Sequence, residues 1–338
     1  MNLAYIHVLR SLSMICIVIY HTYGFVCSPS FFPQSAKEYH DIYYWVNNCV
    51  YTWPAMILFT MISGFLFNYL YEQGRYDDFW RFCKKKAVRL LLPCFTFAIL
   101  MRLISGGSIF TTQFIVDIVK GKLYILRHLW YLPAIFWCLI AGWFFKRYLS
   151  NIFCLILAQL FFLTISLLPP FIPSIIGTGW LQVYMGWFLL GMLLYPLCIH
   201  VMKINTRRGY VVIAFIILYA IQAYYFPVSY PQRTWYSILF LALVCMGTWA
   251  LFLTMGERLL KLCHPLIVLS KYSFGIYIFH HWVATSIIHH AAKLCSLETW
   301  AAHHLILFPL CLTIIVFLVS LFLTHYSTKT KLGRILLS

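Results

Sequence analysis

The stretch AYIHVLRSLSMICIVIYHTYGFV occupies residues 4–26 and consists largely of apolar side chains, with Arg10 as its one formally charged residue. A helix of this length is about 34 Å long, which is enough to cross the roughly 30 Å hydrocarbon core of a bilayer. The stretch therefore predicts a transmembrane helix. Because no A-x-A-like processing site follows it, we interpret it as a span that is retained rather than a cleaved signal peptide.

The rest of the chain has the same character. Of its 338 residues 63% are hydrophobic and 10% are charged, whereas a soluble domain carries roughly 25% charged residues. The composition excludes a soluble protein and predicts an all-α, polytopic transmembrane bundle embedded in a lipid bilayer, with residues 1–338 forming one integral-membrane domain. The ten predicted spans are about 4–26, 46–71, 87–104, 123–145, 151–168, 179–199, 210–227, 234–255, 265–288 and 304–324.

The Lys and Arg residues predict the orientation of this bundle. Sixteen of them fall in the loops on one side, six fall in the loops on the other side, and three lie within or beside spans. Cytoplasmic loops are enriched in Lys and Arg, so both termini are predicted to be cytoplasmic. The same rule accounts for the formal net charge of +17, and we expect no nucleic-acid partner.

The twelve cysteines lie mostly inside apolar runs and form no C-x-x-C motif. This pattern is typical of small buried side chains rather than of a disulfide framework or a metal site. Cys27 and Cys49 are the exception to consider, because both fall at the outer ends of the first two predicted spans, where they could meet.

Arg10 and His21 are polar residues within the first predicted span. They are eleven positions apart, so on a helix they point within about 20° of each other and are separated by about 16 Å of rise. Ionisable side chains in a span usually face a cavity or a partner. The alternatives are that Arg10 extends to the inner headgroups and that His21 is a hydrogen-bonded packing residue. Their shared face favours a functional pair.

All eight carboxylates lie in loops or at the ends of spans. Acid–base chemistry within the membrane would therefore depend on histidine, whose ordinary pKa suits it. His280 lies within a span with His281 on a neighbouring face, and His128 lies where a span begins. No two histidines are four residues apart, so we predict no metal site.

Lys86 and Arg89 belong to the basic segment KKKAVRLLLP, residues 84–93. They are three residues apart and share a helix face, where they could bind phosphate oxygens. The alternative is ordinary positive charge on the cytoplasmic side of a span.

Five short motifs, in order along the chain, resemble the pattern of the membrane acyltransferase-3 family, a group of integral-membrane O-acyltransferases. They are Arg10 and His21 in LRSLSMICIVIYH, Pro54 with Ser63-Gly64 in FTMISGFLF, Lys86 and Arg89 in KKKAVRLLLP, the segment HLWYL at 128–132, and Ser273, Tyr277 and His280 in SKYSFGIYIFH. One position departs from the pattern, since the basic pair of the family is commonly two arginines. Lysine meets a phosphate as a point charge rather than with two parallel hydrogen bonds.

The resemblance implies an O-acyltransferase, in most cases an O-acetyltransferase. Such an enzyme moves an acyl group from cytoplasmic acetyl-CoA, or another acyl-CoA, to a hydroxyl of a cell-surface carbohydrate or its lipid-linked precursor. It also implies the bacterial cytoplasmic membrane as the location, and we expect the stand-alone form without an extracytoplasmic hydrolase-like domain.

The site residues implied by the resemblance fall into three groups. His21 is the expected general base or transient acyl carrier, with His280 or Tyr277 orienting it or stabilising the oxyanion. Donor binding is expected from Arg10, Lys86 and Arg89, and a substrate tunnel from Ser63, His128, Trp130 and Ser273. The alternative is a transporter or flippase of a glycan or small metabolite with no acyl transfer, and a third possibility is a scaffold for glycan assembly.

Overall fold

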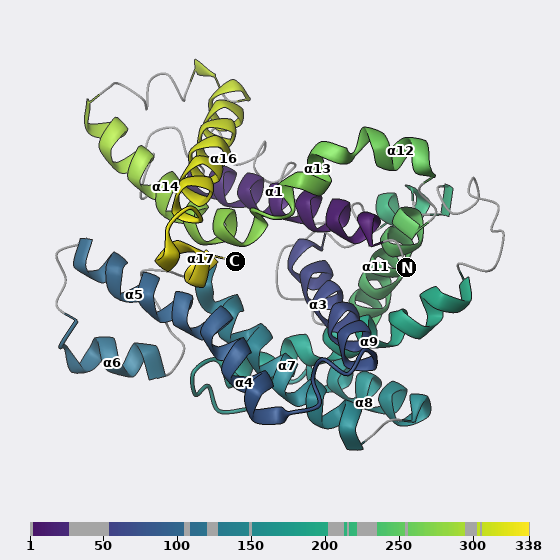
Figure 1. Cartoon of the computed structure of the whole chain (residues 1–338). Coiled ribbons are helices and arrows are strands. Elements are labelled where there is room, and N and C mark those ends of the chain that lie inside the picture. Colours follow the sequence, from purple (N-terminus) through teal and green to yellow (C-terminus); the bar gives the residue numbers. More distant parts are fainter. Residues whose placement is uncertain are drawn as a thin grey trace. The chain divides into compact units, whose positions relative to one another are not determined.

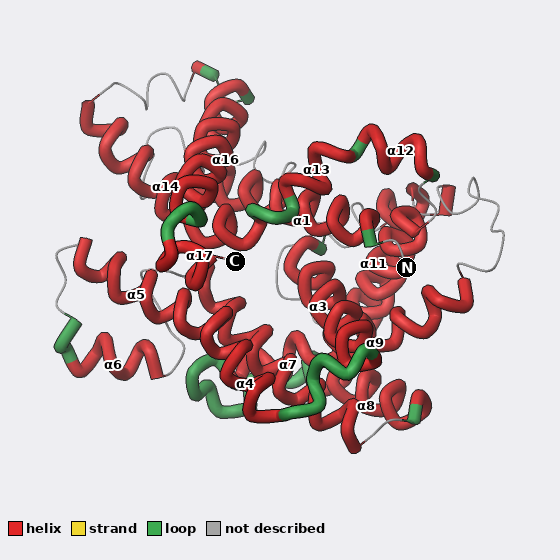
Figure 2. Tube along the Cα trace, viewed as in Figure 1, coloured by secondary structure: helices red, strands yellow, loops and turns green. Residues whose placement is uncertain are grey.

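The computed structural model describes residues 3–26, 54–104, 109–119, 128–148, 151–201, 213–214, 216–221, 235–253, 256–294, 303–304 and 306–337. Within these ranges the chain consists of helices and loops and contains no strand (Figures 1 and 2). The predicted all-α fold class is confirmed. Nine of the twelve cysteines are described and all nine are free thiols, while Cys27 and Cys49 lie outside the described residues.

Seven described helical segments are long and apolar enough to cross a membrane. They are α1 (Ala4–Val26), α3 (Ala55–Glu72), the continuous run Phe79–Ile104, the segment His128–Tyr148 that contains α7 (Tyr131–Tyr148), the segment Thr178–Cys198, α11 (Trp235–Leu253) and α16 (Leu307–Ser327). These seven agree with seven of the ten predicted spans. The count of ten, and the cytoplasmic placement of both termini, stay predictions.

The other three predicted spans differ from the structure or are scarcely covered by it. The stretch predicted at 151–168 forms α8 (Ile152–Ile165), whose 14 residues span only about 21 Å. The stretch predicted at 265–288 is interrupted by a turn at residues 270–272, between α13 (His264–Leu269) and α14 (Ser273–Leu294). Of the stretch 210–227, only 213–214 and 216–221 are described.

Serine hydroxyl groups explain the interruption at residues 270–272. The Ser270 hydroxyl donates to the carbonyl of Ile267 at 2.8 Å, and the Ser273 hydroxyl donates to the carbonyl of Ser270 at 2.8 Å. Such local bonds compete with the helical ladder, so an apolar stretch that reads as one span becomes two helices.

The described helices fall into two compact units. Unit 1 comprises Met1–Met56, Arg208–Gln232 and Phe240–Ser338, and unit 2 comprises Ile57–Arg207 and Arg233–Leu239. In unit 1, α1 packs against α13, α14 and α16, and α14 also packs against α16. In unit 2, α9 (Leu181–Val201) packs against α7 and α8. The prediction of one membrane domain over the whole chain stays a prediction.

Glycines bring α3 and α9 of unit 2 into backbone contact. A Cβ atom added at Gly64 would overlap the backbone carbonyl of Phe188, and one added at Gly191 would overlap the backbone of Met61. Small residues allow membrane helices to approach this closely, so that dispersion contacts and interhelical hydrogen bonds can form. Gly64 thus has a packing role in the Ser63-Gly64 motif.

The run Phe79–Ile104 contains a π-helical turn, where hydrogen bonds span five residues instead of four. It consists of α4 (Phe79–Lys86), η1 (Ala87–Leu91) and α5 (Leu92–Ile104). Pro93 has no N–H to donate to the carbonyl of Arg89, and the Leu92 N–H bonds to Ala87. Proline therefore accounts for the wider turn, which lies between the Lys84–Lys86 run and the apolar α5.

Candidate functional site

Two histidines predicted from separate motifs lie together in unit 1. The ring centroids of His21 on α1 and His280 on α14 are 5.2 Å apart, and the Tyr277 ring lies 5.9 Å from that of His280. His280 is fully buried and Tyr277 is 6% exposed. The structure brings together the three predicted catalytic residues, which come from helices more than 250 positions apart in the sequence.

His281 also belongs to this cluster. Its ring centroid lies 5.6 Å from that of His21 and 4.8 Å from that of Phe25, one helical turn further along α1. The sequence placed His281 on a neighbouring face of its helix, which is correct, but both adjacent side chains are long enough to approach His21. We call His21, Tyr277, His280 and His281 the histidine cluster.

A backbone contact decides which nitrogen of His280 is available. The Nδ1 atom lies 3.1 Å from the carbonyl oxygen of Ile276, one turn earlier on α14. A carbonyl only accepts, so this contact is a hydrogen bond when Nδ1 carries the proton. A neutral His280 then presents Nε2 as an acceptor or base, not as a donor.

A pair of threonines fixes α1 next to His21. The hydroxyl groups of Thr22 and Thr313 lie 2.6 Å apart, and they link α1 to α16. Thr22 is fully buried, Thr313 is 8% exposed, and the Thr313 hydroxyl also lies 2.7 Å from the Pro309 carbonyl. Because Thr22 follows His21 directly, this contact holds the rotation of α1 that turns His21 towards α14.

Arg10 lies on the same helix as His21, where α1 meets α13. The hydroxyl of Ser11 donates to the carbonyl of Leu266 at 2.6 Å, and the hydroxyl of Ser270 lies 2.9 Å from Nδ1 of His7. These bonds hold the first half of α1 against α13. Arg10 itself is partly exposed, and its role in donor binding stays a prediction.

Lys86 lies in an aromatic cluster of unit 2. Its Nζ atom donates to the hydroxyl of Tyr76 at 3.2 Å and lies 5.1 Å from the centre of the Tyr76 ring and 5.6 Å from that of Phe82. The Tyr76 backbone carbonyl accepts a 2.8 Å bond from the indole of Trp143 on α7. Cation–π contacts and the hydroxyl therefore hold Lys86 in one position.

Arg89 is exposed one turn beyond Lys86, within η1. Burial raises the pKa of the Tyr76 phenol, while the charges of Arg89 and Arg75 act in the opposite direction. The phenol accordingly stays protonated at neutral pH, and Arg89 lies close enough to Tyr76 to affect it. Lys86 and Arg89 thus lie around one tyrosine, and their role in binding a donor stays a prediction.

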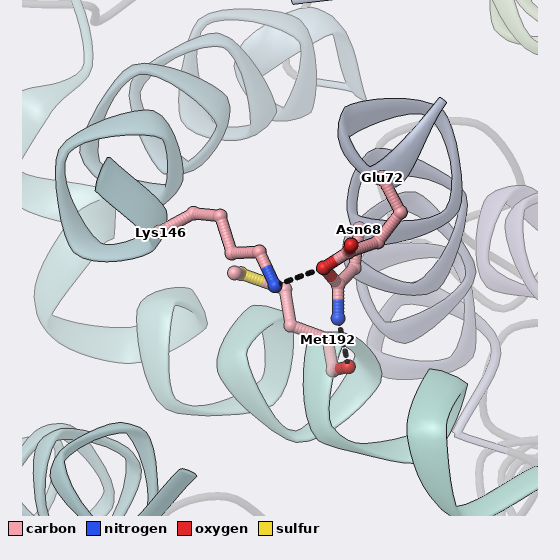
Figure 3. Close-up of polar contacts among 4 residues, drawn as sticks. All are labelled: Asn68, Glu72, Lys146 and Met192. Atoms are coloured by element: carbon pink, nitrogen blue, oxygen red, sulfur yellow. Dashed lines mark hydrogen bonds and ion pairs between the residues drawn. The ribbon is translucent and has the colours of Figure 1, made fainter. Parts of the chain in front are cut away.

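A third polar group of unit 2 links α3 with α7 and α9 (Figure 3). Lys146 forms a 2.5 Å ion pair with Glu72, and the Asn68 side-chain amide donates to the Met192 carbonyl at 2.9 Å. Asn68 is 3% exposed, and among the described residues its side-chain oxygen has no hydrogen-bond partner. This group ties the C-terminal end of α3 to the C-terminal end of α7 and to the middle of α9.

The four predicted tunnel residues do not all lie in one unit. Ser63, His128 and Trp130 are in unit 2, and Ser273 is in unit 1. The hydroxyls of Ser63 and Ser273 donate to the carbonyls of Phe59 and Ser270, at 2.9 Å and 2.8 Å. His128 is 3% exposed and Trp130 is partly exposed. Their assignment to a tunnel stays a prediction.

Sequence reasoning did not identify Thr313, Tyr76 or Asn68. Thr313 lies 291 positions from Thr22, and such pairs have no periodic signal in one sequence. Tyr76 lies ten positions before Lys86, in a stretch rich in charged residues, and a single tyrosine there has no pattern that marks it. In the described part of the chain, no group of three or more His, Cys, Asp or Glu side chains could hold a metal ion. The absence of a metal stays a prediction.

Comparison with known proteins adds one finding to this geometry. A family model described as an acyltransferase domain matches residues 3–325. No curated protein and no solved structure matches the chain. The matched range includes the histidine cluster of unit 1 and both cations of unit 2.

Proposed function

Because this chain belongs to the acyltransferase-3 family, whose domain covers residues 3–325, we propose that it transfers an acyl group from acyl-coenzyme A to a hydroxyl of a carbohydrate. The protein is a membrane acyltransferase. Our proposal adds an acetyl donor on the cytoplasmic side, a cell-surface glycan or its lipid-linked precursor as acceptor, and the bacterial cytoplasmic membrane as the location. The observation that carries it is the 5.2 Å approach of His21 and His280 between buried helices.

His21 acts as the general base in this proposal. It takes the proton of the acceptor hydroxyl while the hydroxyl oxygen attacks the thioester carbonyl carbon. The carbon–sulfur bond of the tetrahedral intermediate then breaks, and the thiolate takes the proton from His21 to leave as coenzyme A. In the other version, a ring nitrogen of His21 attacks the thioester carbonyl carbon, the carbon–sulfur bond breaks, and coenzyme A leaves. The acceptor hydroxyl then attacks the acyl carbon, the bond to His21 breaks, and the freed imidazole takes the hydroxyl proton. The position of His21 suits either version.

His280 and Tyr277 have different roles around that base. With its Nδ1 proton bonded to Ile276, a neutral His280 offers Nε2 as an acceptor. His280 can therefore orient His21 by accepting a hydrogen bond from the His21 ring. A neutral His280 has no free N–H with which to donate to a developing oxyanion. That role falls to the Tyr277 hydroxyl, which is a donor. The structure of the cluster thus favours one of the two roles expected for His280.

The basic residues receive the donor in this proposal. Coenzyme A carries phosphate groups, and Lys86 and Arg89 present two cations around Tyr76. In unit 1, Arg10 is the proposed donor-binding residue on the helix that bears His21. The rise of about 16 Å from Arg10 to His21 is comparable to the extended pantetheine arm between the phosphates and the thioester.

The test of this proposal is coenzyme A binding by calorimetry, with the purified protein in nanodiscs. We expect Arg89→Ala to weaken binding about tenfold, because a charged hydrogen bond contributes roughly 1.5–3 kcal/mol. The matched control is Arg81→Ala, which removes an exposed arginine from the same helical run. Folded wild-type protein that does not bind coenzyme A would overturn the proposal and favour the transporter or flippase.

Thr313→Val should lower the turnover rate about fivefold to tenfold and leave the affinity for coenzyme A unchanged. Valine keeps the shape of threonine but removes the hydroxyl that lies 2.6 Å from Thr22, and a small rotation of α1 displaces a base that must be placed within a fraction of an ångström. The measurement is transfer of labelled acetyl groups. Thr313→Ser keeps the hydroxyl and should restore turnover, and equal rates for the serine and valine variants would contradict the positioning role.

A further inference from the structure

Three aromatic rings meet where α7 and α9 begin in unit 2. Trp130 ends the short helical turn before α7, Trp180 ends η3 (Thr178–Trp180), and Tyr184 lies in the first turn of α9. The ring centroid of Trp130 lies 4.3 Å from that of Trp180 and 5.4 Å from that of Tyr184, with interplanar angles of 32° and 38°. We call these three residues the ring platform.

The ring platform is not a closed stack. The centroids of Trp180 and Tyr184 are 6.2 Å apart, far less than the separation of two rings on opposite faces of Trp130. Trp180 and Tyr184 therefore do not enclose Trp130 between them. All three side chains are partly exposed.

The connection between α8 and α9 is held rigidly beneath Trp180. The buried side-chain nitrogen of Gln182 lies 2.9–3.0 Å from the carbonyls of Ile165, Leu168 and Pro169, so two of these carbonyls share one of its two N–H groups. The side-chain oxygen accepts from the Phe171 N–H at 3.0 Å. These contacts hold a loop that has no regular secondary structure of its own.

A strained residue lies in the same loop. Ile176 has φ of 50°, a conformation that is rare for a β-branched residue. Its N–H donates to the Val119 carbonyl at 2.6 Å, and its carbonyl accepts from the Trp137 indole at 2.9 Å. Gly177 follows with φ of 83°, close against Pro133 of α7. Strain held by surrounding bonds is typical of functional sites, and this loop leads directly into η3, which carries Trp180.

The chemistry of these rings matches a pyranose. A pyranose has an apolar face of C–H groups and a rim of hydroxyls, so it can lie flat on an indole while its rim bonds to polar edges such as the Tyr hydroxyl and the Trp N–H. Interfacial belt residues instead sit at the level of the lipid headgroups. The stacking between two helices and the fixed loop separate the ring platform from such a belt.

The ring platform lies at the end of α7 opposite to its basic end. Lys146 and Arg147 are in the last turn of α7, whereas Trp130 precedes its first turn. The distribution of Lys and Arg therefore predicts the platform on the extracytoplasmic side, away from the donor phosphates and where a cell-surface glycan arrives.

We propose that the ring platform of Trp130, Trp180 and Tyr184 is a binding site for a pyranose ring of the acceptor glycan. The choice of a sugar rests on the proposed function. The geometry supplies the site, because the stacked rings form a partly exposed aromatic surface beside a hydrogen-bonded loop, at the end of α7 opposite Lys146 and Arg147.

Saturation-transfer NMR in nanodiscs tests this site. The probes are the methyl glycosides of glucose, galactose, mannose and N-acetylglucosamine, with cyclohexanol as an apolar control. We expect at least one glycoside to receive saturation at its ring C–H protons, more than cyclohexanol does. Trp180→Leu, which keeps apolar bulk, should lower that signal at least fivefold, whereas Trp180→Phe should retain most of it. Trp80→Ala removes a tryptophan that is 79% exposed at the other end of unit 2 and should change nothing.

Coenzyme A binding on the same preparation separates the two proposals. Three outcomes would overturn the ring platform as a sugar site. Folded wild-type protein transfers saturation to no glycoside, or Trp180→Leu leaves the glycoside signal intact, or cyclohexanol receives as much saturation as the glycosides do. Glycoside binding that depends on Trp180, in a protein that does not bind coenzyme A, supports the sugar site and contradicts the acyltransferase mechanism.

Discussion

We expect His21→Ala to lower the rate of acyl transfer about 100-fold or more, while the variant stays folded and binds coenzyme A as the wild type does. A general base contributes roughly 10²–10⁴-fold to a rate, and no carboxylate lies in the predicted spans to replace it. The neighbouring His280 has Nδ1 bonded to Ile276 and cannot reorient without losing that bond. The measurement is the transfer of labelled acetyl groups to the glycan fraction of cells whose own copy of the gene is deleted.

The matched control is His264→Ala, which removes an exposed histidine at the start of α13 in the same unit. It should leave transfer unchanged. Incubation with labelled donor in the absence of acceptor distinguishes the two mechanisms. If the label becomes covalently attached to the wild-type protein but not to His21→Ala, His21 is an acyl carrier. Substantial transfer by a folded His21→Ala variant would exclude both roles for His21.

Gly64→Leu should destabilise unit 2 by about 3 kcal/mol or more, enough to remove most of the folded protein. Overpacking a core costs roughly 1–3 kcal/mol when side chains can adjust. Here the added Cβ meets the backbone carbonyl of Phe188, which moves only if α3 and α9 separate. That separation would also break the bond between Asn68 and Met192. The measurement is the midpoint of thermal unfolding in detergent, monitored as the amount of protein that remains monodisperse.

Gly179→Ala is the control for this prediction. Its added methyl group would lie 3.3 Å from the nearest atom, the carbonyl oxygen of Ile172, and should shift the midpoint only slightly. If Gly64→Leu unfolds at the wild-type temperature, α3 and α9 do not approach as the structure has them. If it keeps its stability but loses activity, the Ser63-Gly64 motif contributes to the chemistry rather than to packing.

The sequence predicted the parts of the site that depend on a single helix. Arg10 and His21 share a face because of helical periodicity, and the same rule placed Tyr277 and His280 together. The approach of His21 to His280 followed from the family resemblance, since periodicity does not say which helices become neighbours.

Contacts between distant segments could not be predicted in this way. The bond between Thr22 and Thr313 and the bond between Lys86 and Tyr76 depend on how helices cross. Local hydrogen bonds also override an apolar pattern, as Ser270 and Ser273 do where one predicted span becomes two helices. The contacts of Gln182 have no signal in the sequence, because a single glutamine in an apolar stretch does not reveal its partners.

The partners of α1 have a consequence for biosynthesis. Ser11 bonds to Leu266, 255 positions away, and Thr22 bonds to Thr313, 291 positions away. At about 5–20 residues per second, the ribosome needs about 15–60 s to make those partners after α1 has emerged. During that time a helix with an arginine and a histidine waits in the membrane without its native neighbours, while most of unit 2 is already synthesised. The nascent chain therefore acquires its histidine cluster only after most of unit 2 has been made, and a product that stops before α14 lacks His280 altogether.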